Sequence, residues 1–534
     1  MKTKSLLFGL LASAAMVSCT NEVDSIENNG AIQAGETNYV SVNLVAPATT
    51  RATGDFEAGL EEESAVSKAV FLFLDGKYNG CANPFTVEGK DLKWGAADRD
   101  DQTAKATTLV IDGIKNEVPA YIVAILNPTS SMSFSASTSL ADLKGIFDNY
   151  SSKGFVMSNA VYAAENGKEV VATPITLENI AKTKADLDTT DPVSIQVERV
   201  VAKVEVANLG AAITELNTNG LNETIDDQED LQLKFVLTGW EVLQNNQSGL
   251  IKNINATAWT IENWNSIGLK RSYWANDYTA EGRTSYKVGE LTGKNDEFKY
   301  VEETVNQTAT TAAALNSVSP YLLVSGKFVD ATDETKAIDL VEWRGQKYTK
   351  QGYLNLIAGM EEVSQFYTYA GKTTNDKGEE VNQYKSFSAD LLMMQDNTAN
   401  DWGATAVLKD ETTQFYTVTF KADGKTVDVA TPADNKNVKA AIAKFGEVQY
   451  WNGGNTYYFA PIKHQAKDAE TNFYGVVRNH VYKMNISSIT GYGTPVADPT
   501  QAIDEPEDPT EGDTYMNADV VILDWRIVEN EVEL

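Results

Sequence analysis

The stretch ADVVILDWRIVENEVEL, residues 518–534, ends the chain and is strongly apolar. Its alternate residues Val521, Leu523, Trp525 and Ile527 fall on one side of an extended backbone, because strand side chains alternate between two faces. A helix is the alternative, since Val521, Trp525 and Val528 also fall at helical spacing. The many β-branched Val and Ile residues favour a strand. We therefore predict a terminal β-strand.

The segment before this strand is acidic and rich in proline. From Pro495 to Asp513 it holds four of the chain's thirteen prolines and seven carboxylates, with no Lys or Arg. Such a segment repels itself and stays extended, so residues 498–534 are expected to form an acidic tether followed by a strand. The strand then either pairs within its own domain or completes the sheet of a neighbouring molecule.

The beginning of the chain has the pattern of an export signal. Lys2 and Lys4 precede an apolar run, residues 6–17, that is too short to span a bilayer, and Cys19 follows. Small residues before Cys19 resemble a bacterial lipobox. We predict a lipoprotein signal peptide over residues 1–18 and acylation, with palmitate, of Cys19. The alternative is an ordinary secretory signal followed by an incidental cysteine.

A first strand and an isolated arginine follow the leader. Residues 38–46 alternate Val40, Val42 and Leu44 with polar residues, and a small polar loop comes next. Arg51 lies in that loop and is the only Lys or Arg between positions 4 and 68. We predict cleavage between Arg51 and Ala52 by an arginine-specific protease. Residues 19–51 would then leave as a propeptide that carries the first strand, unless Arg51 is merely a surface arginine.

The length and hydrophobic pattern predict a mostly β protein with two domains. The expected domains are 52–207 and 208–497, both β-sandwiches, joined near the polar segment 208–230. The expected strands are 66–74, 109–114, 118–126, 193–206, 231–243, 321–329, 415–420 and 448–461. The few expected helices are 140–147, capped by Ser139 or Ser137, 353–363 and 437–444.

The composition argues against several function classes. Seventy-five acidic residues against 44 basic ones give a net charge of −31, which repels nucleic acid. The chain has two cysteines and two histidines, which leaves few candidate ligands for a metal and few acid–base groups. We found no phosphate-binding loop, nucleophile elbow, zinc-protease helix or EF-hand motif. We predict no enzyme, metal site or cofactor.

Three interpretations of individual residues complete the analysis. Cys81 is a lone thiol if Cys19 is acylated. The glycines in Asn452–Asn455 predict a hairpin turn, and His464 and His480 are expected to hydrogen-bond within a sandwich. Two rival functions remain open: a monomeric lipoprotein that binds glycans through its aromatic residues, and a glycan hydrolase that uses two of the many carboxylates.

Three segments carry a family resemblance. They are RSYWAND (residues 271–277), YWNGGNTYYFAPIKH (450–464) and YGVVRNHVYKMNISSITGYGTPV (474–496). Together they resemble the C-terminal half of the Bacteroidales type V fimbrillins, in particular the major, or shaft, subunits of the short Mfa-type fimbriae. The segments VERVVAKVEV (197–206) and FVLTGWEV (235–242) look like the joint between the two domains of that family.

The resemblance implies a fold and a mode of assembly. Both domains would be transthyretin-like β-sandwiches in tandem. The precursor would be an outer-membrane lipoprotein acylated at Cys19 and cut at Arg51, and the strand carrying Val521, Leu523, Trp525 and Ile527 would fill the groove of the next subunit. The implied partners are identical subunits in a head-to-tail filament, accessory tip and anchor fimbrillins, the protease, and host or bacterial receptors. The implied role is adhesion, biofilm formation and virulence at the cell-surface fimbrium. The presence of both Arg51 and the tail favours a shaft subunit over a tip or anchor.

Overall fold

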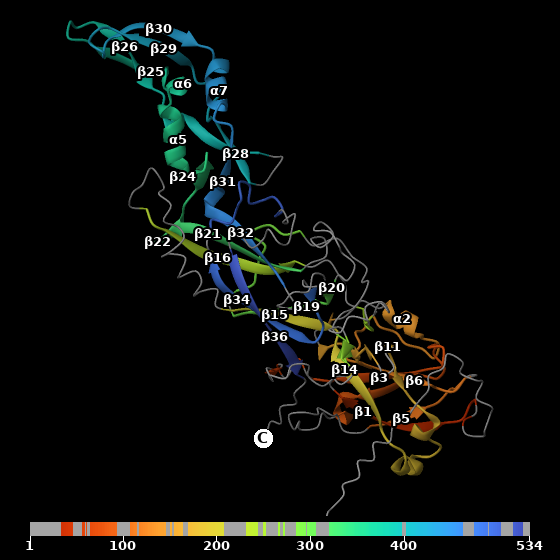
Figure 1. The fold of residues 1–534 in the computed structure, drawn as a ribbon. Coiled ribbons are helices and arrows are strands. Elements are labelled where there is room, and N and C mark those ends of the chain that lie inside the picture. The colour runs from red at the N-terminus through yellow and green to blue at the C-terminus, as the bar shows by residue number, and fades with distance from the viewer. Residues whose placement is uncertain are drawn as a thin grey trace, which may run out of the picture.

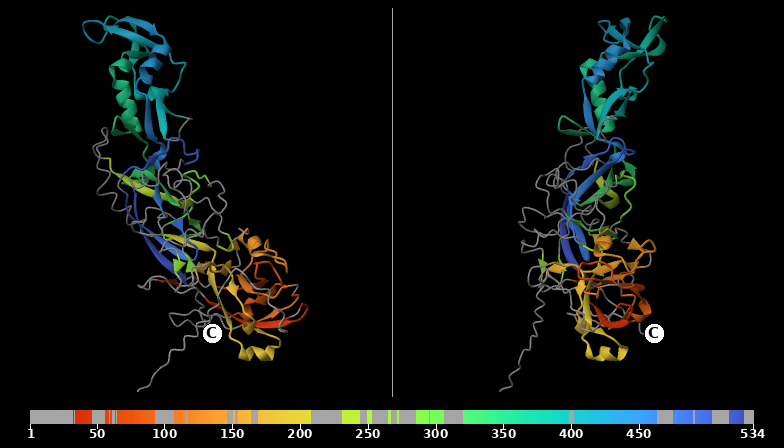
Figure 2. Two further views of the ribbon diagram at one scale, coloured as in Figure 1. Left: turned by 45° about the vertical axis from the view of Figure 1, so that its right-hand side comes forward. Right: turned by 90° about the vertical axis from the view of Figure 1, so that its right-hand side faces the viewer.

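The computed structural model describes residues 32, 34–45, 56–58, 60, 63, 65–92, 107–114, 117–145, 150–151, 154–163, 169–207, 231–243, 249–252, 265–266, 271–272, 285–294, 296–305, 320–397, 402–462, 475–489, 491–503 and 516–526. Strands dominate these residues and helices are few and short, which confirms the predicted mostly β class. Three β-rich bodies follow one another along an elongated molecule (Figures 1 and 2). Within the described residues, no helix has the length and hydrophobicity needed to cross a membrane.

The first body is built on one nine-stranded sheet. Its main order is β13-β1-β14-β9-β6-β3-β4, with β12 beside β6 and β5 beside β1. Alternate side chains of the central strands pack on opposite faces, so that Phe71 and Phe73 join one core while Leu72 and Leu74 join another. The strands are β1 (Asn38–Val45), β3 (Lys68–Leu74), β4 (Phe85–Glu88), β5 (Thr107–Ile111), β6 (Tyr121–Leu126), β9 (Met157–Asn159), β12 (Thr173–Pro174), β13 (Ile180–Ala181) and β14 (Val193–Arg199).

Helix α2 (Leu140–Lys144) packs on this sheet through Leu140 and Leu143. The predicted cap at Ser139 is present: its hydroxyl accepts a hydrogen bond from the Asp142 amide at 3.2 Å, and the Asp142 carboxylate accepts one from the Ser139 amide at 2.8 Å. This reciprocal arrangement satisfies two amides that the first turn would otherwise leave unpaired. The hydrogen bonds hold the pKa of Asp142 below its usual value.

The second body is a sandwich of two sheets. One has the order β19-β15-β34-β36-β2, and the other has the order β16-β21-β32-β35 with β22 beside β21. Val204, Tyr482, Trp240 and Val324 are among the side chains that fill the space between them. The strands are β2 (Phe56–Ala58), β15 (Val201–Ala207), β16 (Leu233–Leu243), β19 (Phe298–Glu302), β21 (Tyr321–Asp330), β22 (Asp333–Ala337), β32 (Asn455–Pro461), β34 (His480–Ile489), β35 (Thr494–Pro495) and β36 (Met516–Arg526).

The third body lies between β22 and β32 in the sequence. It contains a sheet of order β24-β23-β31-β28-β27, a second sheet of order β26-β25-β29-β30, and three helices. Leu340 packs in the core of the second body while its neighbour Val341 packs in the core of the third, so the two bodies are continuous. The elements are β23 (Leu340–Trp343), β24 (Gln346–Thr349), α5 (Lys350–Gly359), α6 (Glu361–Ser364), β25 (Phe366–Thr374), β26 (Glu380–Ser386), β27 (Leu392–Asp396), β28 (Gly403–Leu408), β29 (Phe415–Phe420), β30 (Val427–Ala433), α7 (Asn435–Ala443) and β31 (Glu447–Trp451).

Short elements complete the described chain. The two-stranded pairs are β7 (Tyr150–Ser151) with β8 (Gly154–Phe155), β10 (Tyr162–Ala163) with β11 (Glu169–Val170), β17 (Asn265–Ser266) with β18 (Arg271–Ser272), and β20 (Thr304–Val305) with β33 (Gly475–Val476). Short 3-10 helices occur at Gly89–Asp91, Leu177–Asn179, Lys184–Thr189, Ala389–Leu391 and Asn452–Gly454.

Three expected elements differ from the structure. The single strand predicted over 193–206 is two strands, β14 and β15, because the Val200 amide donates to the Val156 carbonyl at 3.1 Å and the chain there passes to another sheet. The helix predicted over 353–363 is divided into α5 and α6 at Met360, which has extended backbone angles. The hairpin predicted at 452–455 is wrong: β31 and β32 lie in different sheets, although Gly453 and Gly454 do have the positive φ that was expected.

The expected division into domains 52–207 and 208–497 stays a prediction, and two strands cross it. β2 and β15, both numbered within 52–207, lie in the first sheet of the second body. The third body falls inside 208–497 and has a hydrophobic core of its own.

Candidate strand-exchange site

Strand β1 lies in the interior of the first sheet. One edge pairs with β5 over five residue positions, from Asn38 opposite Ile111 to Val42 opposite Thr107. The other edge pairs with β13 at two positions and runs parallel to β14 at four. Both edges of β1 are therefore hydrogen-bonded, and a sheet without β1 would have a groove bounded by strands on both sides.

The apolar side chains of β1 are part of the core. Val40, Val42 and Leu44 are at most 2% exposed, and they pack in the same cluster as Phe71, Ile122 and Ile195. Burial of three aliphatic side chains stabilises the sheet by roughly 5–9 kcal/mol in gross terms. The alternation of apolar and polar residues that predicted this strand is therefore explained by the burial of its apolar face in the core.

Strand β36 pairs with β34 of the same chain. The antiparallel ladder covers nine residue positions, from His480 opposite Asp524 to Ile489 opposite Met516. On its other edge, and counting only the residues that the structure describes, β36 pairs with β2 alone, at Asp524, Trp525 and Arg526. Most of β36 is thus an edge strand, held on one side. The predicted strand is confirmed over Met516–Arg526, and its side chains lie outside the described ones.

Glu63 connects this edge to the rest of the molecule. Its carboxylate accepts hydrogen bonds from the Leu60 amide and the Tyr300 hydroxyl, both at 2.6 Å, and lies 3.2 Å from the Lys203 ammonium group. Arg199 donates from Nε to the Glu63 carbonyl at 2.8 Å. The described residues 56–58, 60 and 63 therefore link the end of β36, through β2, to a buried carboxylate next to β14 and β15.

The joint between the first two bodies buries several charged groups. Burial lowers the pKa of the Arg199 guanidinium to about 9, against the opposing effect of the neighbouring Glu63. Nearby, Lys252 lies 3.4 Å from both Glu198 and Glu303, and Arg478 donates to Glu303 at 2.6 Å. All of these side chains are fully buried. A buried charge requires a close partner, so these contacts fix how the two bodies meet.

The remaining predicted site residues have different outcomes. Cys19, Arg51, Ala52, Ile527 and His464 lie outside the described residues, so their predicted roles stay predictions. Val521, Leu523 and Trp525 lie in β36. His480 is buried and its Nδ1 lies 2.8 Å from the Arg478 carbonyl, as expected for a structural histidine. Cys81 is a buried free thiol whose Sγ contacts the Phe73 carbonyl at 3.4 Å.

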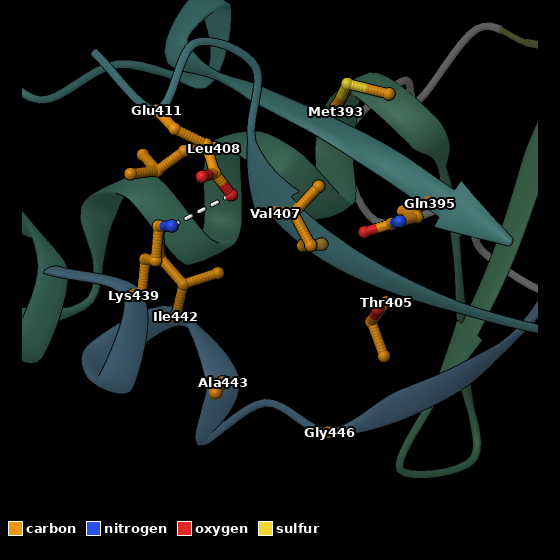
Figure 3. A pocket seen from close by; sticks show the side chains of 11 residues that line it. Met393, Gln395, Thr405, Val407, Leu408, Glu411, Lys439, Ile442, Ala443 and Gly446 are labelled. Carbon is orange, nitrogen blue, oxygen red and sulfur yellow. Dashed lines mark ion pairs between the residues drawn. The ribbon is translucent and has the colours of Figure 1, made fainter. Parts of the chain in front are cut away.

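A hollow of about 460 Å³ lies in the third body, between β27, β28 and α7 (Figure 3). Val407, Leu408 and Ile442 give it an apolar wall, and the ion pair between Lys439 and Glu411, at 2.8 Å, lies at one end. Both charged side chains are more than two-fifths exposed, so water screens them. No group of three or more metal-ligating residues occurs in the part of the chain that the structure describes.

The sequence reasoning missed the buried charges of the joint. Glu63 follows an acidic run, and Arg199 and Lys203 lie among valines in a segment that read as one strand. The alternation marked β14 and β15 as buried, but only the crossing between sheets at Val200 brings their polar side chains to Glu63. The valine-flanked charges themselves were the available indication, because a charge among buried residues needs a partner.

The C-terminal part of the chain matches a known protein family. Residues 449–531 match a fimbrillin family model. Its description is "Major fimbrial subunit protein type IV, Fimbrillin, C-terminal", and the matched range runs from β31 through β36. The fimbrillin resemblance expected from the sequence is confirmed for this segment, whereas the major-subunit subtype stays a prediction. No curated protein gives a significant match to the chain.

Several solved structures resemble the fold at low sequence identity. A proposed cell adhesion protein from Parabacteroides distasonis is 11% identical, with a TM-score of 0.38, and the match covers 91% of this chain and 96% of that one. The C-terminally truncated tip fimbrial protein Mfa3 from Porphyromonas gingivalis is 12% identical, with a TM-score of 0.29, and the match covers 91% of this chain and 100% of that one. A fimbrial assembly protein from Parabacteroides distasonis is 11% identical, with a TM-score of 0.26, and the match covers 74% of this chain and 99% of that one. At these identities and TM-scores the likenesses assign no function.

Proposed function

We propose that this protein is a structural, non-enzymatic subunit of a cell-surface fimbria that polymerises by strand exchange. A fimbrial subunit role is supported by the fimbrillin match over residues 449–531. The finer proposal is a shaft subunit, exported as a lipoprotein acylated at Cys19, cut after Arg51, and joined head to tail by insertion of the C-terminal strand into a neighbour. Adhesion to host or bacterial surfaces, together with accessory tip and anchor subunits, belongs to the same proposal.

The single observation that carries the proposal is the contrast between β1 and β36. β1 is hydrogen-bonded along both edges, whereas β36 is hydrogen-bonded along one edge and at three positions of the other. A β36 strand that leaves β34 and β2 of its own chain and takes the place of β1 in a neighbour exchanges nine pairs on one edge and three on the other for a more even division, five pairs with β5 and six with β13 and β14. Because β36 and β1 belong to different bodies of one chain, the exchange between copies is heterologous and generates filaments.

The energetics require both ladders. Burial of four large apolar residues contributes roughly 6–12 kcal/mol, while ordering ten backbone residues costs about 10–20 kcal/mol. Side-chain burial alone is thus too weak for a stable joint, and hydrogen bonds along two edges have to contribute. The groove left by β1 offers two edges, from β5 and β14.

The proposed cleavage falls between the two strands that it has to separate. Arg51 lies between β1, in the first sheet, and β2, which pairs with the end of β36. A cut there releases β1 from the rest of the chain and leaves Glu63 and β2 with the mature subunit. Cleavage therefore opens the acceptor groove in the first sheet and leaves β2, which pairs with β36 of its own chain, in place.

Limited proteolysis of the full precursor tests the proposal. A trace of trypsin is expected to give one early cut after Arg51, identified by mass spectrometry, followed by ladders on native gels and filaments in electron micrographs. Arg51→Ala should block the cut, the ladders and the filaments. Arg344→Ala, which changes an exposed arginine in the turn between β23 and β24, is the matched control and should polymerise normally.

Variants of the tail test the donor strand separately. Deletion of residues 519–534, or Trp525→Asp, should leave a folded and cleavable subunit that does not elongate. A synthetic peptide of residues 516–534 should bind the cut precursor and not the intact one. Wild-type filaments from the deleted chain would refute strand exchange, and a cut protein that stays monomeric but binds glycans would favour the monomeric lipoprotein.

A further inference from the structure

The outer sheet of the third body carries aromatic side chains on one face. Tyr367 pairs with Tyr416 across β25 and β29, and Tyr369 pairs with Tyr384 across β25 and β26. Phe420 lies four residues beyond Tyr416 on β29 and therefore faces the same way. Five rings from three strands thus share one face, which we call the aromatic strip.

Neighbouring rings of the strip touch one another. The ring centroids of Tyr384 and Tyr416 are 5.1 Å apart, those of Tyr367 and Phe420 are 5.7 Å apart, and those of Tyr369 and Tyr384 are 5.8 Å apart. Each pair is edge to face, an arrangement that fixes ring orientation. The strip is therefore an ordered surface built on strands.

The strip faces away from the core of its own body. Tyr369 is 47% exposed and Phe420 is 39% exposed, and the other three rings are half-buried. The opposite face supplies Phe366 and Phe415 to the core, and farther out it carries the exposed Thr417. Sheets that bury one face normally expose polar residues on the other, so an exposed aromatic face indicates a binding surface.

We propose that the aromatic strip binds an uncharged carbohydrate chain. Its five rings offer flat apolar surface to the C–H groups of sugar rings, and four of them also carry a hydroxyl that can donate or accept a hydrogen bond. The sheet holds the rings in place before binding, which limits the entropy lost on association.

The exposed area favours a narrow ligand over a protein. The five partly exposed rings together present at most the area of two full rings, roughly 300–500 Å², taking about 150–250 Å² for each aromatic side chain. A specific protein–protein interface buries about 800 Å² on each partner. The strip is thus too small for a stable second copy of the chain, and of a suitable size for a few sugar units.

The charge favours an uncharged ligand. Single-stranded nucleic acids also stack on aromatic rings, but a protein of net charge −31 repels them, and it repels sulfated or sialylated glycans in the same way. The charged pair beside the strip, Lys372 and Glu380 at 3.1 Å, neutralises itself. A neutral oligosaccharide is not repelled by the net negative charge, and its binding would not bury an unpaired charge.

The strip lies far from the strands of the proposed assembly. Figures 1 and 2 show β25, β26 and β29 at one end of the elongated molecule, with β1 and β36 toward the other. Its function is thus independent of strand exchange and goes beyond the proposed role as a subunit.

Glycan binding by the full-length protein tests the inference. The probes are immobilised neutral oligomers of glucose, mannose, galactose and N-acetylglucosamine, with sialylated and sulfated oligosaccharides as a separate arm. Binding to at least one neutral oligomer is expected, with affinity measured by calorimetry. The double variant Tyr369→Ala/Tyr384→Ala should weaken that binding about tenfold or more, since a central aromatic pair is removed.

The matched control changes the other face of the same sheet. Thr419 and Val429 are cross-strand partners that are exposed there, so Thr419→Ala/Val429→Ala should leave affinity unchanged. Circular dichroism and the thermal transition confirm that each variant is folded. Binding to no neutral oligomer, binding to anionic glycans alone, or equal loss in both double variants would overturn the proposal.

Discussion

The carboxylate of Glu63 and the ammonium group of Lys203 lie 3.2 Å apart, and both side chains are at least 95% buried. Lys203 belongs to β15 in the second body, while the Glu63 carbonyl accepts a hydrogen bond from Arg199 at the end of β14 in the first. One residue just beyond the predicted cleavage site thus joins two sheets.

Removing the charge of Glu63 should destabilise the protein. Glu63→Gln leaves Lys203 buried without its carboxylate, and breaking a buried ion pair costs about 3–5 kcal/mol. The measurement is the first transition in urea unfolding of the full chain. Glu380→Gln is the control, because Glu380 pairs with Lys372 at an exposed site and such pairs contribute only about 0–1 kcal/mol. Equal effects of the two variants would contradict the structural role of Glu63.

Leu44→Ala should destabilise the precursor and not the processed filament. Leu44 is 2% exposed in the core of the first sheet, so its truncation leaves a cavity that costs about 2–5 kcal/mol. If residues 19–51 depart, the mature subunit no longer contains position 44. Thermal unfolding of intact and processed protein checks this, with the half-buried Asn43→Ala as a control of small effect. A lower transition temperature in the processed variant would mean that β1 stays in place.

The sequence predicts most of the strands, for a physical reason. A strand that buries one or both faces has an apolar pattern of period two or a continuous apolar run, and β3, β6, β16, β21 and β29 follow such patterns. Helix α2 was predictable from Ser139, because the capping box is a local interaction.

The sequence could not predict which sheet each strand joins. Leu340 pairs with Trp451, and β1 lies beside β14, across more than a hundred intervening residues in each case. Such pairings depend on the whole chain, so local pattern merged β14 with β15 and missed the third body. The glycines at 453 and 454 did predict positive φ, which is a local property, but not the direction in which the chain leaves the turn.

Asp423 should titrate well below an ordinary aspartate. Its carboxylate accepts hydrogen bonds from the hydroxyl and amide of Thr426 and from the Lys425 amide, which lower its pKa to about 2. Because the pKa is lower in the folded state, the ionised carboxylate stabilises the fold. This stabilisation is complete at pH values above the unfolded-state pKa of about 3.9, and it is lost as the pH falls through about 2.

The Asp423 titration is observable by NMR of the side-chain carboxyl. Thr426→Val removes the hydroxyl donor and should raise the pKa toward its usual value. Thr419→Val, in the strand that leads to the same turn, should leave the titration in place. An unchanged Asp423 pKa in Thr426→Val would show that the hydroxyl is not responsible.

Gly454 should tolerate alanine much less well than Gly446. Both glycines have positive φ, 68° and 71°, so an alanine at either position is strained by about 1–2 kcal/mol. An alanine Cβ at 454 would also lie 2.3 Å from the Phe328 carbonyl oxygen, which belongs to the backbone of β21 and cannot move aside, whereas nothing lies within 4 Å of one at 446. Gly454→Ala should therefore lower the unfolding midpoint in urea several times as far as Gly446→Ala. Similar losses would show that backbone strain alone decides both sites, and that the turn between β31 and β32 is free to separate from β21.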